Sequence, residues 1–94
     1  MRLTHAGLLV LKACMDRSGD RLHGYELMQV TGLASGTLYP ILMRFERDGW
    51  LASSWEEADP REEGRPRRRL YKITGAGQST LTQYLGSLGL GVAA

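Results

Sequence analysis

Cysteine and long apolar runs are scarce in this chain of 94 residues. The single cysteine, Cys14, cannot form a disulfide within the chain, and its isolation favours a reducing, cytoplasmic setting. The longest uninterrupted apolar run is Leu8–Leu11, which is far too short to cross a bilayer. The N-terminus lacks a long apolar stretch followed by a small-residue cleavage site, so we expect no secretion signal and no membrane association.

Groups that could carry enzyme or metal chemistry are equally few. The two histidines, His5 and His23, and the lone cysteine stand at no metal-ligand spacing, and they form no nucleophile–base series with the serines. The Gly75–Gly77 segment lacks the strand-to-helix context of a nucleotide-binding loop. We therefore expect no catalytic residue, no metal and no cofactor. Cys14 is expected to pack in the core, and His23 to support the start of a helix.

Charge is unevenly distributed along the chain. Apolar residues make up 43% and charged residues 23%, an ordinary globular composition, and the length fits one domain with a modest core. The net charge of +2 combines −2 over residues 1–60 with +4 over residues 61–94. An acidic stretch at 56–63 is followed directly by a basic run at 65–72, a pattern typical of an exposed loop with a basic arm.

Three helices are expected before residue 50. The first, over Leu3–Met15, is apolar around most of its circumference, so we expect burial on two sides, the second side being a subunit contact. A short helix over Gly24–Val30 and a tight connection follow. Ser35 then stands where an N-cap is expected, and its hydroxyl could accept a first-turn N–H. The third helix extends from there to about Asp48 and is closed by Gly49.

A β-hairpin follows the third helix. The pattern predicts strands over Trp50–Trp55 and Arg69–Ile73, and the segment between them, Glu56–Arg68, contains Pro60, Gly64 and Pro66 and forms the hairpin tip. A two-stranded ribbon is marginal alone, so the hairpin must lean on the helices. The side chains expected to make this contact are Trp50, Leu70 and Ile73.

A last helix is expected over Gly75–Leu88, with Thr74 as its N-cap. Its glycines weaken it, so it needs a partner surface. The apolar stripe it presents serves as core or as a dimer seam, and residues 89–94 are expected to form a frayed tail. The stripe consists of Leu81, Tyr84, Leu85 and Leu88.

The predicted order of elements is that of a winged helix-turn-helix domain: mainly α with a small β-hairpin, in which three helices precede two strands and a final helix. Four blocks of the sequence resemble the PadR family of transcription regulators, and the resemblance covers about Leu3 to Gly77. The Gly-Thr-Leu-Tyr-Pro sequence in the second block is the most specific part. The blocks are His23–Leu27 (HGYEL), Ser35–Leu42 (SGTLYPIL), Arg44–Leu51 (RFERDGWL) and Gly64–Thr74 (GRPRRRLYKIT).

This resemblance implies a homodimeric repressor that binds a near-palindromic DNA operator close to the gene it controls. Family members often respond to small molecules, typically phenolic acids or hydrophobic drugs, so a small-molecule effector is a possible partner. The family's C-terminal dimerisation region is usually a long helix or a helical domain, whereas only about twenty residues follow Thr74 here. We expect a winged helix-turn-helix domain at 1–77 and a short C-terminal dimerisation helix and tail at 78–94.

A recognition helix presents polar groups to base edges from its first turns. Ser35, Thr37, Tyr39 and Pro40 occupy that end of the third helix, so we expect them to contact DNA. The alternative is that Ser35 is only a cap and that Tyr39 packs against the wing, which is the predicted hairpin over residues 50–73. Two further candidates lie later on the helix, where they could bind phosphates or form a solvated, ion-paired face. They are Arg44 and Arg47.

The wing carries a sharper electrostatic pattern. Arginines in a short loop suit phosphate contacts and a narrow minor groove, although such a run can also be a solvated surface. The acidic residues upstream either repel phosphate or pair with the arginines when DNA is absent. The candidate DNA contacts here are Arg65, Arg67, Arg68, Arg69 and Lys72.

The sequence thus predicts a cytoplasmic, homodimeric DNA-binding regulator of PadR type. The alternative is a winged helix that serves protein or RNA contacts and no longer binds an operator. The first and last helices are expected to form the dimer. The candidate interface residues are Leu8, Leu9, Leu81, Tyr84, Leu85 and Leu88.

Overall fold

The computed structural model describes residues 3–89, so the expected tail at 90–94 lies outside the described residues. The fold is mainly helical with a small antiparallel sheet, as predicted. The elements, in chain order, are α1 (His5–Asp16), β1 (Leu22–His23), α2 (Gly24–Thr31), α3 (Ser35–Arg47), β2 (Leu51–Trp55), α4 (Pro60–Glu63), β3 (Arg69–Ile73) and α5 (Gly75–Ser87).

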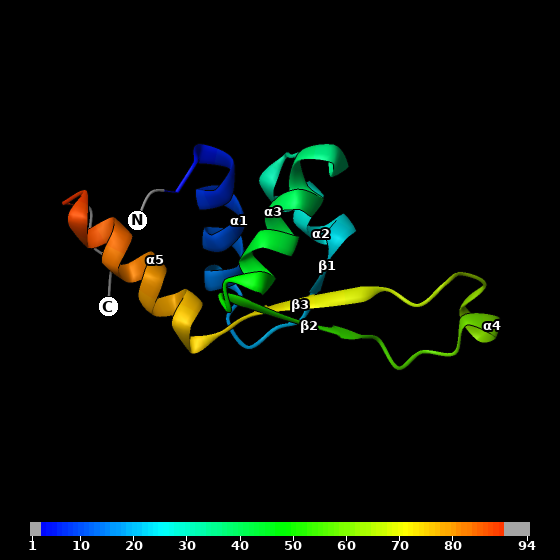
Figure 1. Ribbon diagram of the computed structural model, residues 1–94. Coiled ribbons are helices and arrows are strands. Elements are labelled where there is room, and N and C mark those ends of the chain that lie inside the picture. The colour runs from blue at the N-terminus through cyan, green and yellow to red at the C-terminus, as the bar shows by residue number, and fades with distance from the viewer. Residues whose placement is uncertain (1–2, 90–94) are drawn as a thin grey trace.

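The helices gather over one part of the sheet, and the hairpin leaves them (Figure 1). α1, α2 and α3 form a cluster above the sheet, and α5 lies beside α1 at one end of the molecule. The β2–β3 hairpin projects from the other end and carries α4 at its far tip. The molecule is consequently elongated, with extents of 49 × 24 × 22 Å. Among residues 3–89, no helix is long and apolar enough to cross a membrane.

Capping side chains determine where most helices begin. His23 Nδ1 accepts from Glu26 N–H while the Glu26 carboxylate accepts from His23 N–H, both at 3.3 Å, which forms a capping box at the start of α2. The Thr74 hydroxyl accepts from Gly77 N–H at 3.0 Å and caps α5. Both predicted roles are confirmed. The first helix begins at His5 and not at Leu3, because Thr4 is its cap.

The prediction that Ser35 caps the third helix was wrong. The extended cap residue is Ala34 (φ −72°, ψ 156°), which has no side chain that can accept a hydrogen bond. Ser35 is therefore the first helical residue, and its side chain is exposed. At the other end Gly49 closes the helix with φ +80°, as predicted.

The core is built from one face of each element. Leu11, Leu27, Leu38 and Phe45 are fully buried between the first three helices, and Cys14 packs with them as predicted. The sheet and α5 close the core from the side. Their buried side chains are Leu22, Leu51, Tyr71, Ile73, Leu81 and Leu85.

The hairpin leans on the helices through a set of residues that differs from the expected one. Ile73 is buried, and the Trp50 ring lies 5.2 Å from the Phe45 ring, as predicted. Leu70 was expected at this contact and does not join the core, because alternation along β3 places Tyr71 and Ile73 on the core face and Leu70 on the other. Leu51 takes its place.

Two short elements were not predicted. β1 adds a third strand, giving the order β1-β3-β2, with Leu22 opposite Tyr71 and His23 opposite Leu70. The hairpin tip contains α4, a single turn capped by Asp59 and ended by Gly64 in the left-handed conformation. β1 ties the start of α2 to the wing strand.

Candidate nucleic-acid interface

The N-terminal tip of α3 is an exposed polar surface on a rigidly held helix. Leu38 and Leu42 anchor α3 in the core, each with no exposed surface. The opposite face therefore points to solvent. The exposed residues of this face include the four predicted tip residues, which are Ser35, Thr37, Tyr39 and Pro40. Pro40 lies inside α3, where it lacks the N–H that would bond to the preceding turn.

Arg44 and Arg47 lie further along the exposed side of α3. The Arg44 guanidinium lies 5.6 Å from the centre of the Phe45 ring, and Arg47 Nε lies 4.0 Å from an Asp48 carboxylate oxygen. Both side chains remain exposed, so this long ion pair is worth little. Together with Pro40 and Met43 they line an open hollow of about 600 Å³ on the helix surface.

Glu46 does not pair with these two arginines but points to the sheet. Its carboxylate accepts from the Ser53 hydroxyl and from Arg69 Nη2, the latter at 3.3 Å. The Arg69 guanidinium also lies 4.9 Å from the centre of the Trp55 ring. Arg69 therefore joins the C-terminal half of α3 to the base of the wing.

Arg65 is likewise held within the chain. Its guanidinium forms an ion pair with Glu56 and lies 3.9 Å from Glu63. Glu56 also accepts from Arg68 N–H at 2.9 Å. The hydrogen bond from Arg65 is the main cause that lowers the pKa of the Glu56 carboxyl, and it raises the pKa of Arg65 in return. Of the alternatives left open by the sequence, pairing is the one the structure contains.

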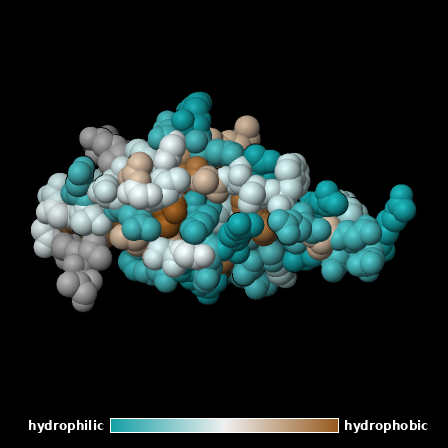
Figure 2. Space-filling view, turned by 90° about the horizontal axis from the view of Figure 1, so that it is seen from below, coloured by the Kyte–Doolittle hydropathy of each residue, from teal (hydrophilic) through white to brown (hydrophobic). Residues whose placement is uncertain are grey.

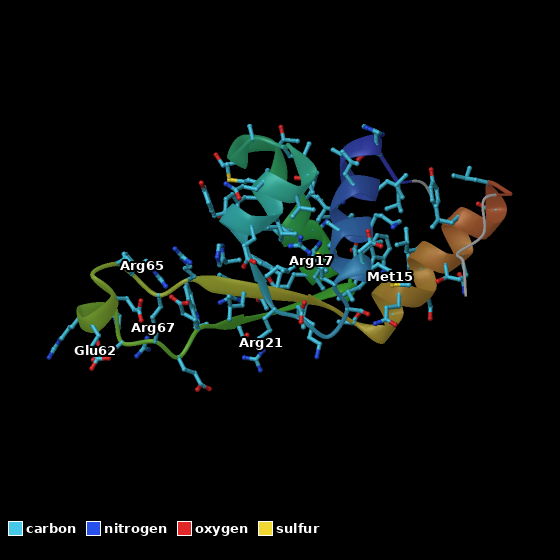
Figure 3. All side chains as sticks on the ribbon, turned by 180° about the vertical axis from the view of Figure 1, so that it is seen from behind. Met15, Arg17, Arg21, Glu62, Arg65 and Arg67 are labelled. Carbon is cyan, nitrogen blue, oxygen red and sulfur yellow. The ribbon has the colours of Figure 1, made fainter. Side chains whose placement is uncertain are left out.

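Arg67 and Arg68 keep exposed guanidinium groups. Arg67 Nε donates to the Ala58 carbonyl at 3.1 Å, and Arg68 Nη1 lies 3.1 Å from His23 Nε2. Both side chains are exposed, and neither forms an ion pair within residues 3–89. Figure 3 places Arg65 and Arg67 near Glu62 at the far end of the hairpin, away from the helices.

Lys72 is separated from the other predicted wing residues. It pairs with Ala52 near the base of the hairpin, on the face of β3 opposite to Tyr71 and Ile73. Glu46 of α3 contacts Ser53 and Arg69, so α3 lies on the Tyr71 face. The structure thus brings Tyr39 of α3 together with Arg68 and Arg69 and leaves Lys72 on the far side of the sheet.

The projecting hairpin is the most hydrophilic part of the underside. Figure 2 shows hydrophilic side chains over most of the hairpin, whereas the rest of the face below the sheet mixes hydrophilic and intermediate side chains with scattered hydrophobic ones. Residues 3–89 contain no cluster of His, Cys, Asp or Glu that could hold a metal ion.

The predicted dimer residues divide into two groups. Leu81 has no exposed surface and Leu85 is buried, so both belong to the core of a single chain. Tyr84 is half-buried, and its hydroxyl lies 3.5 Å from the Leu3 carbonyl, which joins α5 to the segment before α1. The side chains that keep surface for a partner are Leu8, Leu9 and Tyr84, which are half-buried, and Leu88, which is 51% exposed.

A small hollow beside the α3 tip contains residues that the sequence did not mark as site residues. It measures about 160 Å³ and lies where the start of α2, the α3 tip and the wing strand meet. Tyr25 is 61% exposed here, and its hydroxyl accepts from Gln29 at 2.9 Å. Among the lining residues, His23, Gly24 and Tyr25 were not predicted as site residues, and the HGYEL block was the sequence feature that contained them. The lining residues are His23, Gly24, Tyr25, Tyr39, Arg68 and Arg69.

Three helices, a three-stranded sheet and a projecting hairpin define a winged helix-turn-helix protein. The sequence model of the PadR-like transcriptional regulator family matches residues 10–83. The chain belongs to this family, as the sequence resemblance predicted.

Known proteins resemble the chain in sequence and in fold. Transcriptional regulator Rv3488 of Mycobacterium tuberculosis is 41% identical over 61 residues, which are 65% of this chain and 47% of the relative. The chain thus spans about half the length of this curated relative. A PadR-like transcription factor from Bacteroides fragilis is 27% identical with a TM-score of 0.72, over 89% of this chain and 82% of that one. A PadR family regulator from Clostridium difficile, 21% identical with a TM-score of 0.71 over 92% of each chain, shares the fold.

Proposed function

We propose that this chain is a sequence-specific DNA-binding regulator whose α3 tip reads base edges in the major groove. The observation that carries the proposal is the exposed polar first part of α3, where Tyr39 shares a hollow with Arg68 and Arg69 of the projecting hairpin. Ser35 and Thr37 offer hydroxyls that bond to bases or phosphates, and Tyr39 offers a hydroxyl and a ring edge for a thymine methyl group. Because Leu38 and Leu42 fix the helix in the core, the backbone that carries these groups is held in place.

The wing supplies affinity that does not depend on sequence. Arg67 and Arg68 have exposed guanidinium groups without a carboxylate partner among residues 3–89, so their charge is available to phosphates. Arg65 and Arg69 have a structural role, because their ion pairs with Glu56 and Glu46 stabilise the conformation of the hairpin. The wing therefore presents the charges of Arg67 and Arg68 to the DNA backbone or minor groove.

The regulator acts as a homodimer and a repressor. α1 and α5 pack together at the end of the molecule opposite the wing, where Leu8, Leu9 and Leu88 remain partly or largely exposed. Pairing two copies there would bury this apolar surface and leave both α3 tips free. A two-fold dimer requires a near-palindromic operator with half-sites about 34 Å apart, or a multiple of that distance. In this proposal residues 1–77 form the DNA-binding domain and 78–94 the dimerisation segment.

Binding-site selection from a random duplex pool tests the proposal, with the mass of the protein measured in the same buffer. We expect an enriched near-palindromic sequence, a dimer mass and an affinity that falls steeply with salt. Weak binding without sequence preference would refute the proposal and support a protein-contact module. Preferential binding of single-stranded or double-stranded RNA in a parallel pool would support the RNA alternative.

A further inference from the structure

Gly24 touches the recognition helix at the point where α2 begins. A Cβ atom added to Gly24 would lie 2.1 Å from Tyr39 Oη, 2.7 Å from Tyr39 Cζ and 3.1 Å from Tyr39 Cε1. Real Cβ atoms do not approach neighbours so closely, so any other residue at this position would displace the Tyr39 ring. Gly24 does not have a positive φ angle, so its backbone conformation is open to every residue. A glycine is needed at position 24 because the Tyr39 side chain occupies the space that a Cβ atom would fill.

Burial contributes little to holding the Tyr39 side chain in place. Its side chain is 42% exposed, whereas the anchoring residues of α3 are fully buried. On its protein side the ring meets Gly24, and the same hollow is lined by His23 and Arg68. These neighbours are themselves fixed, because His23 caps α2 and Arg68 Nη1 lies 3.1 Å from His23 Nε2.

We propose that Gly24 is a positioning residue, which sets the direction of the Tyr39 phenol and thereby the base preference of the α3 tip. The inference rests on the proposed DNA-binding function. A methyl group at residue 24 forces Tyr39 into another rotamer, which moves the hydroxyl away from its place at the tip while α3 itself stays anchored by the core. Contacts to phosphates through Arg67 and Arg68 are unaffected.

The test compares Gly24→Ala with Gly75→Ala. Both glycines are the first residue of a helix, neither has a positive φ, and a Cβ at Gly75 would meet no atom within 4 Å. Affinity is measured on the selected operator and on a duplex of scrambled sequence. We expect Gly24→Ala to lose about 10-fold in the ratio of the two affinities, the scale of one good base contact. Scrambled-duplex affinity and salt dependence stay unchanged, and Gly75→Ala matches the wild type.

A double-variant cycle identifies the contact responsible. In a Tyr39→Ala background the added methyl group has nothing to displace, so Gly24→Ala causes no further loss of discrimination and no further change in Tm. NMR of tyrosine-labelled protein without DNA adds a direct reading, in which the Tyr39 ring signals shift in Gly24→Ala and stay in place in Gly75→Ala. If Gly24→Ala is unstable and the double variant Gly24→Ala,Tyr39→Ala is stable, the result would support the steric contact itself.

The outcomes separate this inference from the proposed function. Wild-type protein that does not distinguish operator from scrambled DNA contradicts the proposed function. If Gly24→Ala distinguishes operator from scrambled DNA as well as the wild type does, only the role of Gly24 is contradicted. An equal loss of affinity for both duplexes in Gly24→Ala, with a lower Tm, would show that Gly24 serves stability alone and would also overturn the inference.

Discussion

Removing the guanidinium of Arg67 or Arg68 isolates the wing's contribution to DNA binding. Both side chains are exposed and lack a carboxylate partner among the described residues, so truncation leaves no buried group unsatisfied. The fold of the hairpin does not depend on their charge, because Arg65 and Arg69 supply its ion pairs. Alanine at either position therefore leaves both ion pairs of the hairpin in place. It removes one guanidinium, together with the Arg67 hydrogen bond to the Ala58 carbonyl or the Arg68 contact with His23 Nε2.

The magnitude follows from counterion release. Each phosphate contact contributes about 0.9 to the slope of log affinity against log salt concentration. Arg67→Ala and Arg68→Ala should each lower the slope by about one, and the double variant by about two. Between about 50 and 200 mM salt, each single variant should then lose about 3-fold less affinity than the wild type. Each substitution should change the affinity for operator and for scrambled DNA equally, because phosphates carry no sequence information.

Fluorescence anisotropy over a range of salt concentrations measures these slopes. Arg21→Ala is the charge-matched control, since Arg21 is exposed and Figure 3 shows it on the side of the sheet away from the helices. Its slope should equal that of the wild type. Equal slopes for Arg67→Ala, Arg68→Ala and the control would refute the assignment of the wing to phosphate contacts.

Four further predictions follow from the same structure. Tyr39→Ala should lower operator affinity while leaving scrambled-duplex affinity unchanged, and loss of both in a binding titration would contradict its role as a base reader. Gly77→Ala places a Cβ 2.3 Å from the Trp50 carbonyl oxygen, so urea unfolding should show a loss of about 1–3 kcal/mol. Burial raises the pKa of the Cys14 thiol from 9.0 to about 11. Because the unfolded chain loses this proton first, Cys14 should lower the free energy of unfolding by about 2–3 kcal/mol over this pH range, and Cys14→Ala should remove this contribution. Leu88→Arg should weaken the dimer in sedimentation equilibrium, whereas Val30→Arg, at a residue of similar exposure on α2, should leave it intact.

Local patterns in the sequence were sufficient to predict the main helices and the hairpin. The apolar repeat of Leu38, Leu42 and Phe45 predicted the buried face of α3, and the side chains of His23 and Thr74 predicted where two helices begin. These features depend on residues a turn or less apart, so they are visible without a fold. Ser35 shows the limit of this reasoning, because the backbone enters the helix one residue earlier than its capping chemistry suggested.

Contacts between distant segments could not be predicted. β1 is too short to show alternation and exists because Leu22 pairs with Tyr71 of β3. The same holds for the site, where Arg69 meets Glu46 of α3 and Gly24 meets Tyr39. A run of arginines looks uniform in the sequence, and only the fold separates those that hold the hairpin from those that face solvent.

The account depends on one duplex meeting the α3 tip and the wing at the same time. Two single-cysteine proteins, Thr37→Cys and Arg67→Cys in a Cys14→Ala background, can each carry a tethered iron chelate that cleaves nearby DNA. On the selected operator, we expect the residue 37 probe to cut within each half-site and the residue 67 probe to cut beside it on the same duplex, in a pattern symmetric about the operator centre. Cleavage from only one of the two positions would contradict the account.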